Sequence, residues 1–132
     1  MIITFDFDQT LSELHVRKLA KKLHHGGNDV RIVTARNGNI NNSWNQDILN
    51  AVQEIGIEDK LVTFTCMELK DKFLEEIKAD IHIDDDIEEL AAIKKNCSKT
   101  IGVNVLDIDK VFEKFGNYII TINYHNLYLN KK

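Results

Sequence analysis

The sequence predicts an α/β fold, with three α/β/α layers around an open, Rossmann-like parallel sheet. Short apolar runs rich in β-branched residues alternate with amphipathic helical segments along the chain, and this alternation implies parallel strands joined by crossover helices. Polar side chains follow the ends of several runs, as they do at the ligand-binding edge of such a sheet. At 132 residues, 43% of them hydrophobic, the chain suits one packed core. We therefore expect a single domain over residues 1–132.

Five apolar runs are expected to form the strands of this sheet. They cover residues 1–6, 29–35, 61–65, 79–84 and 100–105. Valine, isoleucine and threonine, which favour extended structure, are frequent in these runs. The last extended segment is predicted over residues 117–132, where Ile119 to Leu129 forms either an edge strand or a subunit contact in a homo-oligomer.

Amphipathic segments between the runs are expected to form the helices. The first has leucines at helical spacing and closes on a glycine pair. These residues are Leu14, Leu19, Leu23, Gly26 and Gly27. The second has Asn42 or Ser43 as its N-cap and an apolar stripe that faces the core and ends at Gly56. The stripe consists of Trp44, Ile48, Leu49, Val52 and Ile55.

Three more helices are expected in the second half of the chain. They cover residues 68–77, residues 87–95 and the segment from Asp107 to Phe115. Residues at helical spacing in the first of them should face inward. They are Leu69, Phe73, Leu74 and Ile77.

Polar residues after the strands should meet at one edge of the sheet, because the carboxyl ends of parallel strands lie together. Asp6 and Asp8 share a face, since side chains two apart in a strand point the same way. The residues after the next three strands are Thr34, Ala35 and Arg36, then Lys70 and Lys72, then Asp84, Asp85 and Asp86. Carboxylates beside a hydroxyl and an ammonium suit Mg²⁺ together with an anionic substrate.

Four of these segments, in order, resemble the marks of the haloacid dehalogenase (HAD) superfamily of phosphohydrolases. They are DFDQT from Asp6 to Thr10, IVTAR with Thr34, LKDKFLEEI with Lys70, and IDDD ending at Asp86. The resemblance extends from Ile3 to Asp86 and implies a HAD-like fold. DxDxT alone would be weak evidence, but the four together are specific.

The resemblance also implies a role for each residue. Asp6 would be the nucleophile that forms an aspartyl-phosphate, and Asp8 the general acid and then the base. Mg²⁺ would be held by Asp6, by the backbone carbonyl of Asp8 and by Asp85, with Asp84 nearby as a ligand to water. The remaining residues, which would bind the phosphoryl group, are Thr34, Ala35, Arg36 and Lys70.

Several alternatives stay open at this stage. Asp85 and Asp86 could be the metal pair instead of Asp84 and Asp85, and Lys72 competes with Lys70, which the spacing favours. Gln9 occupies a position that is commonly glycine in nucleotidase-like relatives. Arg36 either binds phosphate or lies in solvent, Asp86 to Glu89 is expected to be a solvated helix start, and Trp44 is expected in the core rather than as a base-stacking platform. The histidines His24, His25 and His82 are expected to be structural.

The function that these residues predict is Mg²⁺-dependent hydrolysis of a phosphomonoester, with a nucleotide or another small substrate favoured. Leu11 to Asp29 and Asn37 to Leu69 leave no room for a cap domain, so a bulky substrate or a second subunit would have to exclude water. A net charge of −4 argues against long nucleic acids. The alternatives are a polynucleotide 3′-phosphatase or phosphoprotein phosphatase, and a HAD-fold binding module without turnover.

The compartment expected from the sequence is the cytoplasm. Cys66 and Cys97 lie in or beside apolar segments and are expected to be reduced thiols. The acidic N-terminus does not resemble a secretory signal. No apolar run approaches the roughly 20 residues that a bilayer-spanning helix needs.

Overall fold

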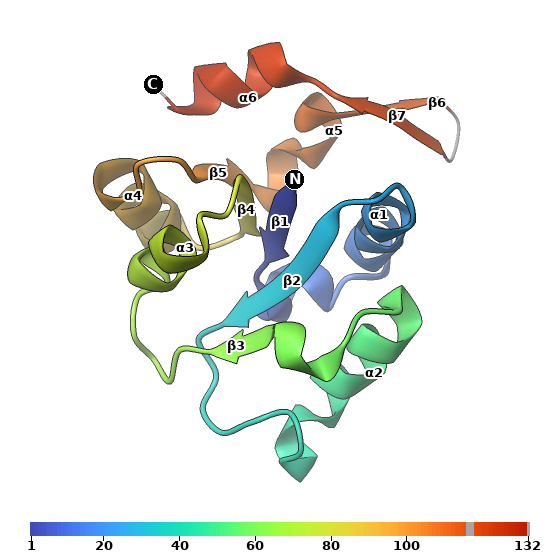
Figure 1. The fold of residues 1–132 in the computed structure, drawn as a ribbon, viewed down its shortest axis with the longest axis vertical. Helices are drawn as coiled ribbons and strands as arrows, with labels where there is room; N and C mark the ends of the chain where they lie inside the picture. The colour runs from blue at the N-terminus through green and yellow to red at the C-terminus, as the bar shows by residue number, and fades with distance from the viewer. Residues whose placement is uncertain (116–117, 132) are drawn as a thin grey trace.

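The protein forms a five-stranded, wholly parallel sheet with helices on both faces (Figure 1). A computed structural model describes residues 1–115 and 118–131. The strands are β1 (Ile2–Phe5), β2 (Asp29–Thr34), β3 (Val62–Phe64), β4 (Ile81–Asp84) and β5 (Ile101–Asn104). Their order across the sheet is β3-β2-β1-β4-β5. The predicted α/β class and parallel sheet are confirmed.

Helices pack against both faces of the sheet. α1 (Leu14–His25) packs beside α2 (Gln46–Ile55), and α3 (Asp71–Ile77) beside α4 (Ile87–Asn96) on the opposite side (Figure 1). A large apolar cluster lies under α1 and α2, and a smaller one that includes Leu74 and Ile93 lies under α3 and α4. The two faces therefore differ in how much apolar core they contain.

The order of the strands puts the polar strand ends at a point where the sheet reverses direction. From β1 the chain moves outward to β3 and then returns to place β4 on the other side of β1. In open α/β sheets the crevice for ligands lies at such a reversal, outside the carboxyl ends of the strands. Residues 7–28 contain one turn (Phe7–Leu11) and α1, and residues 35–61 contain a loop, short 3-10 turns and α2. Neither segment carries an inserted domain.

Three apolar residues of the predicted helical patterns are exposed. Trp44 is 67% exposed because it lies in the 3-10 turn Ser43–Asn45 that precedes α2, off the helical stripe. Leu69 is half-exposed because α3 begins only at Asp71, and Leu14, at the first position of α1, is also half-exposed. In each case the apolar residue lies in the chain just before or at the start of a helix, where periodicity alone does not fix the face.

The C-terminal part differs from the sequence prediction. The helix expected from Asp107 to Phe115 is limited to α5 (Ile108–Val111), after which β6 (Phe112–Phe115) pairs antiparallel with β7 (Tyr118–Ile122). The rest of the segment expected to be extended is α6 (Tyr124–Lys131), and its ends, residues 117 and 132, lie outside the described residues. The hairpin is a separate two-stranded sheet rather than an edge of the main one.

This C-terminal unit packs on the main core. Phe112 is fully buried and Leu127 is 1% exposed, and both belong to the cluster under α1 and α2. α6 also contacts β5, and β7 contacts α1 (Figure 1). No helix in the described part of the chain is long and apolar enough to cross a membrane.

Truncating Leu127 tests whether the C-terminal helix belongs to the core of a single chain. Leu127→Ala should lower the free energy of unfolding by about 2–5 kcal/mol, because it leaves a cavity in a packed cluster. Leu106→Ala is the control, since Leu106 is 86% exposed, and it should change stability by less than about 0.5 kcal/mol. Urea unfolding followed by circular dichroism measures both. Equal effects of the two substitutions would contradict the packing of α6.

Candidate functional site

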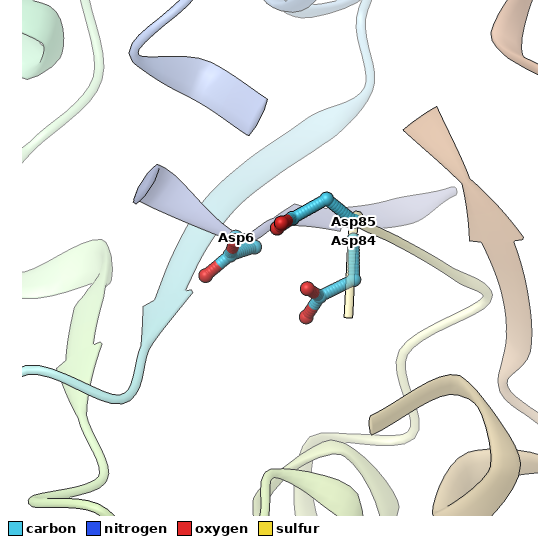
Figure 2. Close-up of side chains that lie close together, drawn as sticks. All are labelled: Asp6, Asp84 and Asp85. Atoms are coloured by element: carbon cyan, nitrogen blue, oxygen red, sulfur yellow. The ribbon is translucent and has the colours of Figure 1, made fainter. Parts of the chain in front are cut away.

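Three carboxylates gather where β1 and β4 end (Figure 2). Asp6 follows β1, and its backbone N–H donates to the carbonyl of Ile83 at 2.9 Å, which continues the pairing of the two strands. Oxygen atoms of Asp6, Asp84 and Asp85 lie within 4.8 Å of one another. Asp6 and Asp84 are buried and Asp85 is half-buried. A set of three carboxylate oxygens, two of them from adjacent residues, fits a hard divalent cation such as Mg²⁺.

Lys70 supplies the positive charge of the site. Its ammonium donates to Asp6 Oδ1 and to Asp84 Oδ2, both at 2.7 Å, and its side chain is 2% exposed. Its backbone N–H donates to Glu89 Oε1 at 3.0 Å. Lys72, the alternative considered from the sequence, is an exposed residue that pairs with Glu68. The structure therefore brings Lys70, and not Lys72, to the carboxylates.

Burial and charge shift the pKa values of these groups in opposite directions. Burial raises the pKa of Asp6, against the attraction of Lys70 and with the repulsion of Asp84. Burial acts in the same direction on Asp84, but hydrogen bonds and charges from His82 and Lys70 hold its pKa well below the usual range. The pKa of Lys70 is raised, because the two carboxylates outweigh its own burial. A second cation beside Asp6 would favour its ionised form.

The three consecutive acids at the end of β4 have different partners. Asp84 Oδ1 accepts from the backbone N–H of Asp86 at 3.1 Å, and Asp85 Oδ1 accepts from the hydroxyl of Thr10 at 3.3 Å. Asp86 caps α4, accepting from the backbone N–H of Glu88 at 2.9 Å. Asp84 and Asp85, rather than Asp85 and Asp86, therefore gather with Asp6.

Asp8 lies beside this cluster, but its carboxylate is paired with Arg36. The guanidinium donates to both oxygens of Asp8, at 2.7 and 3.0 Å, and to both oxygens of Asp47, at 2.7 and 2.8 Å. It also lies 5.0 Å from the centre of the Phe7 ring. The hydrogen bonds that Arg36 donates to Asp47 and Asp8 raise its pKa. Arg36 is thus neither free in solvent nor an unpaired cation.

A cavity of about 210 Å³ opens onto these groups. Its lining consists of Asp6, Asp8, Gln9, Ala35, Lys70, Asp84, Asp85, Asp86 and Glu89. Thr34 and Arg36 are not among the described residues that line this cavity. Thr34 is buried, and its hydroxyl accepts from the backbone N–H of Arg36 at 3.3 Å. This bond leaves the hydroxyl proton of Thr34 available to a phosphoryl oxygen, but Thr34 is 1% exposed and does not line the cavity.

Gln9 adopts a left-handed conformation with φ of 57° in the turn after β1. Such a φ costs a non-glycine residue about 1–2 kcal/mol. Gln9 tolerates this turn and also lines the cavity.

Sequence reasoning missed four residues that support the site. Asp47 orients Arg36, and Glu89 is buried against the backbone of Lys70 instead of being solvated as expected. His82 Nε2 and Thr4 lie behind Asp84, with His82 hydrogen-bonded to both. Burial lowers the pKa of His82, against the hydrogen bond and charge of Asp84, which raise it. The sequence did contain a signal for two of them, because His82 and Thr4 are polar residues in strands that are otherwise mostly aliphatic.

No protein-family model matches the chain, and no curated protein matches it. The HAD resemblance therefore depends on the four motifs and on the chemistry of the site.

Substituting each lysine in turn tests the charge balance of the site. Lys70→Met should lower the free energy of unfolding by about 3–5 kcal/mol, because it leaves two buried carboxylates without their cation. Lys72→Met is the same substitution at an exposed lysine and should change the free energy of unfolding by less than about 1 kcal/mol. Chemical unfolding of the two variants at pH 7 provides the comparison. Similar stabilities would show that the buried ammonium of Lys70, with its hydrogen bonds to Asp6 and Asp84, stabilises the fold no more than an exposed lysine does.

Proposed function

We propose that the chain is a Mg²⁺-dependent phosphomonoester hydrolase with a HAD-like fold. The observation that carries the proposal is the buried ammonium of Lys70 between Asp6 and Asp84, beside a three-carboxylate cluster that opens to a cavity. The position of this cluster at the reversal of the strand order supports it. The same residues are those that the four HAD-like motifs select.

In the proposed reaction an oxygen of Asp6 attacks phosphorus, and the bond from phosphorus to the leaving oxygen breaks. To act as general acid, Asp8 would leave its bidentate pairing with Arg36, take up a proton from water and give it to that oxygen; it would afterwards take a proton from the water that hydrolyses the aspartyl-phosphate. Inorganic phosphate leaves and Asp6 is restored. Asp6 and Asp85, with the backbone carbonyl of Asp8, would hold Mg²⁺, which neutralises charge so that a phosphate dianion can approach. Lys70 stabilises the charge on the transferring group.

The buried charges favour an enzyme over a binding module that has lost turnover. Removing Asp6, Lys70 and Asp84 from water costs free energy that apolar residues of similar volume would not cost. A chain without need of the reaction would gain stability by replacing them. The position of these buried charged groups beside an open cavity supports a catalytic role.

An exposed tryptophan near the site favours a nucleotide as substrate. The backbone carbonyl of Trp44 accepts from Arg36 Nη1 at 3.4 Å, and Arg36 in turn binds Asp8, so the tryptophan lies one residue from the cavity lining. Its side chain is 67% exposed, and an exposed indole provides a surface on which a nucleobase can stack. The backbone N–H of Met67, a residue 75% exposed, donates to the carbonyl of Ala35 at 2.8 Å.

Replacing the proposed nucleophile tests the reaction. Asp6→Asn should reduce Mg²⁺-dependent phosphate release at least about 10³-fold, since an amide is not a competent nucleophile and removal of such a group is that costly. Asp59→Asn, an exposed aspartate far along the chain, should retain wild-type turnover. Phosphate release is measured with and without chelator on mononucleotides, oligonucleotide 3′-phosphates and a phosphopeptide. Turnover by folded Asp6→Asn protein near the wild-type rate would refute the mechanism, and preference for the polymers would select the alternative substrate classes.

Truncating the exposed indole tests the substrate class. Trp44→Ala should raise KM for a mononucleotide about tenfold, because one base-stacking contact of about 1–3 kcal/mol is lost. It should leave KM for glycerol phosphate unchanged. Trp44→Phe keeps an aromatic face and should recover most of the affinity. An equal rise in KM for both substrates would show that Trp44 shapes the site without contacting a base.

A further inference from the structure

His82 is a buried polar residue that the proposed reaction does not use. It lies in β4 with 0% of its surface exposed. Its neighbours Ile81 and Ile83 belong to the apolar cluster under α1 and α2, so the alternation of the strand directs His82 toward α3 and α4. An imidazole in this position needs two hydrogen-bond partners to offset its burial.

Both ring nitrogens have a partner. His82 Nε2 lies 2.8 Å from Asp84 Oδ2, and Nδ1 lies 2.6 Å from the hydroxyl oxygen of Thr4. A carboxylate can only accept, so Nε2 carries the proton and donates it to Asp84. On the other side of the ring lies Thr4, a fully buried residue that is the register partner of His82 in β1 and whose hydroxyl also donates to the carbonyl of Ile81 at 3.3 Å. The ring is therefore held from both sides, with the Nε2 proton directed at Asp84.

This imidazole completes the set of donors around Asp84. Oδ2 accepts from His82 and from the ammonium of Lys70, while Oδ1 accepts from the backbone N–H of Asp86. The carboxylate is thus held by donors on both oxygens and cannot rotate without losing one of them. Because Lys70 also donates to Asp6, the orientation of Asp84 determines where the ammonium lies relative to Asp6.

We propose that His82 is a positioning residue, which holds Asp84 and through it Lys70 in the geometry that the reaction at Asp6 needs. This inference rests on the proposed function for its effect on turnover. His82 does not line the cavity, so it acts through Asp84 and not on the substrate. Groups that orient the residues of a metal or catalytic site commonly contribute 10–100-fold to affinity or activity.

Two substitutions separate positioning from core packing. His82→Leu fills a similar volume without a donor, and His82→Gln places an amide N–H near the position of Nε2. We expect kcat to fall about 10–100-fold in His82→Leu with KM changed less than about threefold, and to recover to within about fivefold of wild type in His82→Gln. Ile81→Val, on the opposite face of the same strand, should leave kcat within about twofold. Wild-type kcat in folded His82→Leu protein would overturn the proposal.

The imidazole proton of His82 can be observed without any substrate. Proton–nitrogen correlation of the histidine rings at pH 7 should show one slowly exchanging imidazole proton on Nε2, absent in His82→Leu and altered in Asp84→Asn. A proton on Nδ1 alone would overturn the proposal, because Nε2 could not then donate to Asp84. Lack of phosphatase activity in wild-type protein that shows the expected Nε2 proton would instead count against the proposed function alone.

Discussion

The ammonium of Lys70 between Asp6 and Asp84 is the interaction on which the rest of the site depends. Lys70 is the N-cap residue of α3, and its ammonium connects this helix to the ends of β1 and β4. Each of its two charged hydrogen bonds is 2.7 Å long. Charged groups taken out of water are stable only when their partners are well placed. The backbone of Lys70 is therefore fixed as well, by Glu89 at the start of α4. The carboxylates, α3 and α4 form one connected arrangement.

This requirement explains why the two faces of the sheet differ. The face under α1 and α2 contains most of the apolar core, including side chains from β1, β2, β4 and the C-terminal helix. The face under α3 and α4 has a smaller apolar cluster because Thr4, His82, Asp84 and Lys70 occupy much of the same layer. Apolar burial on the first face supplies stability, while hydrogen bonds on the second fix the directions of charged side chains.

The sequence was most informative where a single physical rule decides the outcome. Five β-branched runs became the five strands, and acids placed after β1 and β4 had to meet because parallel neighbours end at the same edge. It was less informative where local pattern and tertiary packing compete. Trp44 fits a helical stripe by spacing, but the helix begins after it. Phe112 to Phe115 fits a helix as well as a strand, and pairing with β7 decides between them.

Contacts between residues distant in the sequence were beyond such rules. His82 had the pattern of a residue in a buried strand, yet its bond to Thr4 follows from the register of β4 against β1. Glu89 was expected to be a solvated residue of a helix start, and the sequence predicted no role for Asp47. Only the positions of Lys70 and Arg36 show that each acid holds a cationic residue in place. A single sequence shows which residues carry chemistry more readily than which residues hold them.

The charges around the cavity explain why the proposed reaction needs a divalent cation. The lining contains six carboxyl groups, those of Asp6, Asp8, Asp84, Asp85, Asp86 and Glu89, against the one ammonium of Lys70. Arg36 does not offset the negative charge of the lining, because its guanidinium is paired with both Asp8 and Asp47. A phosphate dianion entering such a site meets a net negative field, which becomes stronger as water is displaced. Asp6 and Asp85 would hold the cation, which would offset this negative field where Asp6 approaches phosphorus, so in the proposed reaction substrate affinity and the reactivity of Asp6 would depend on the same ion.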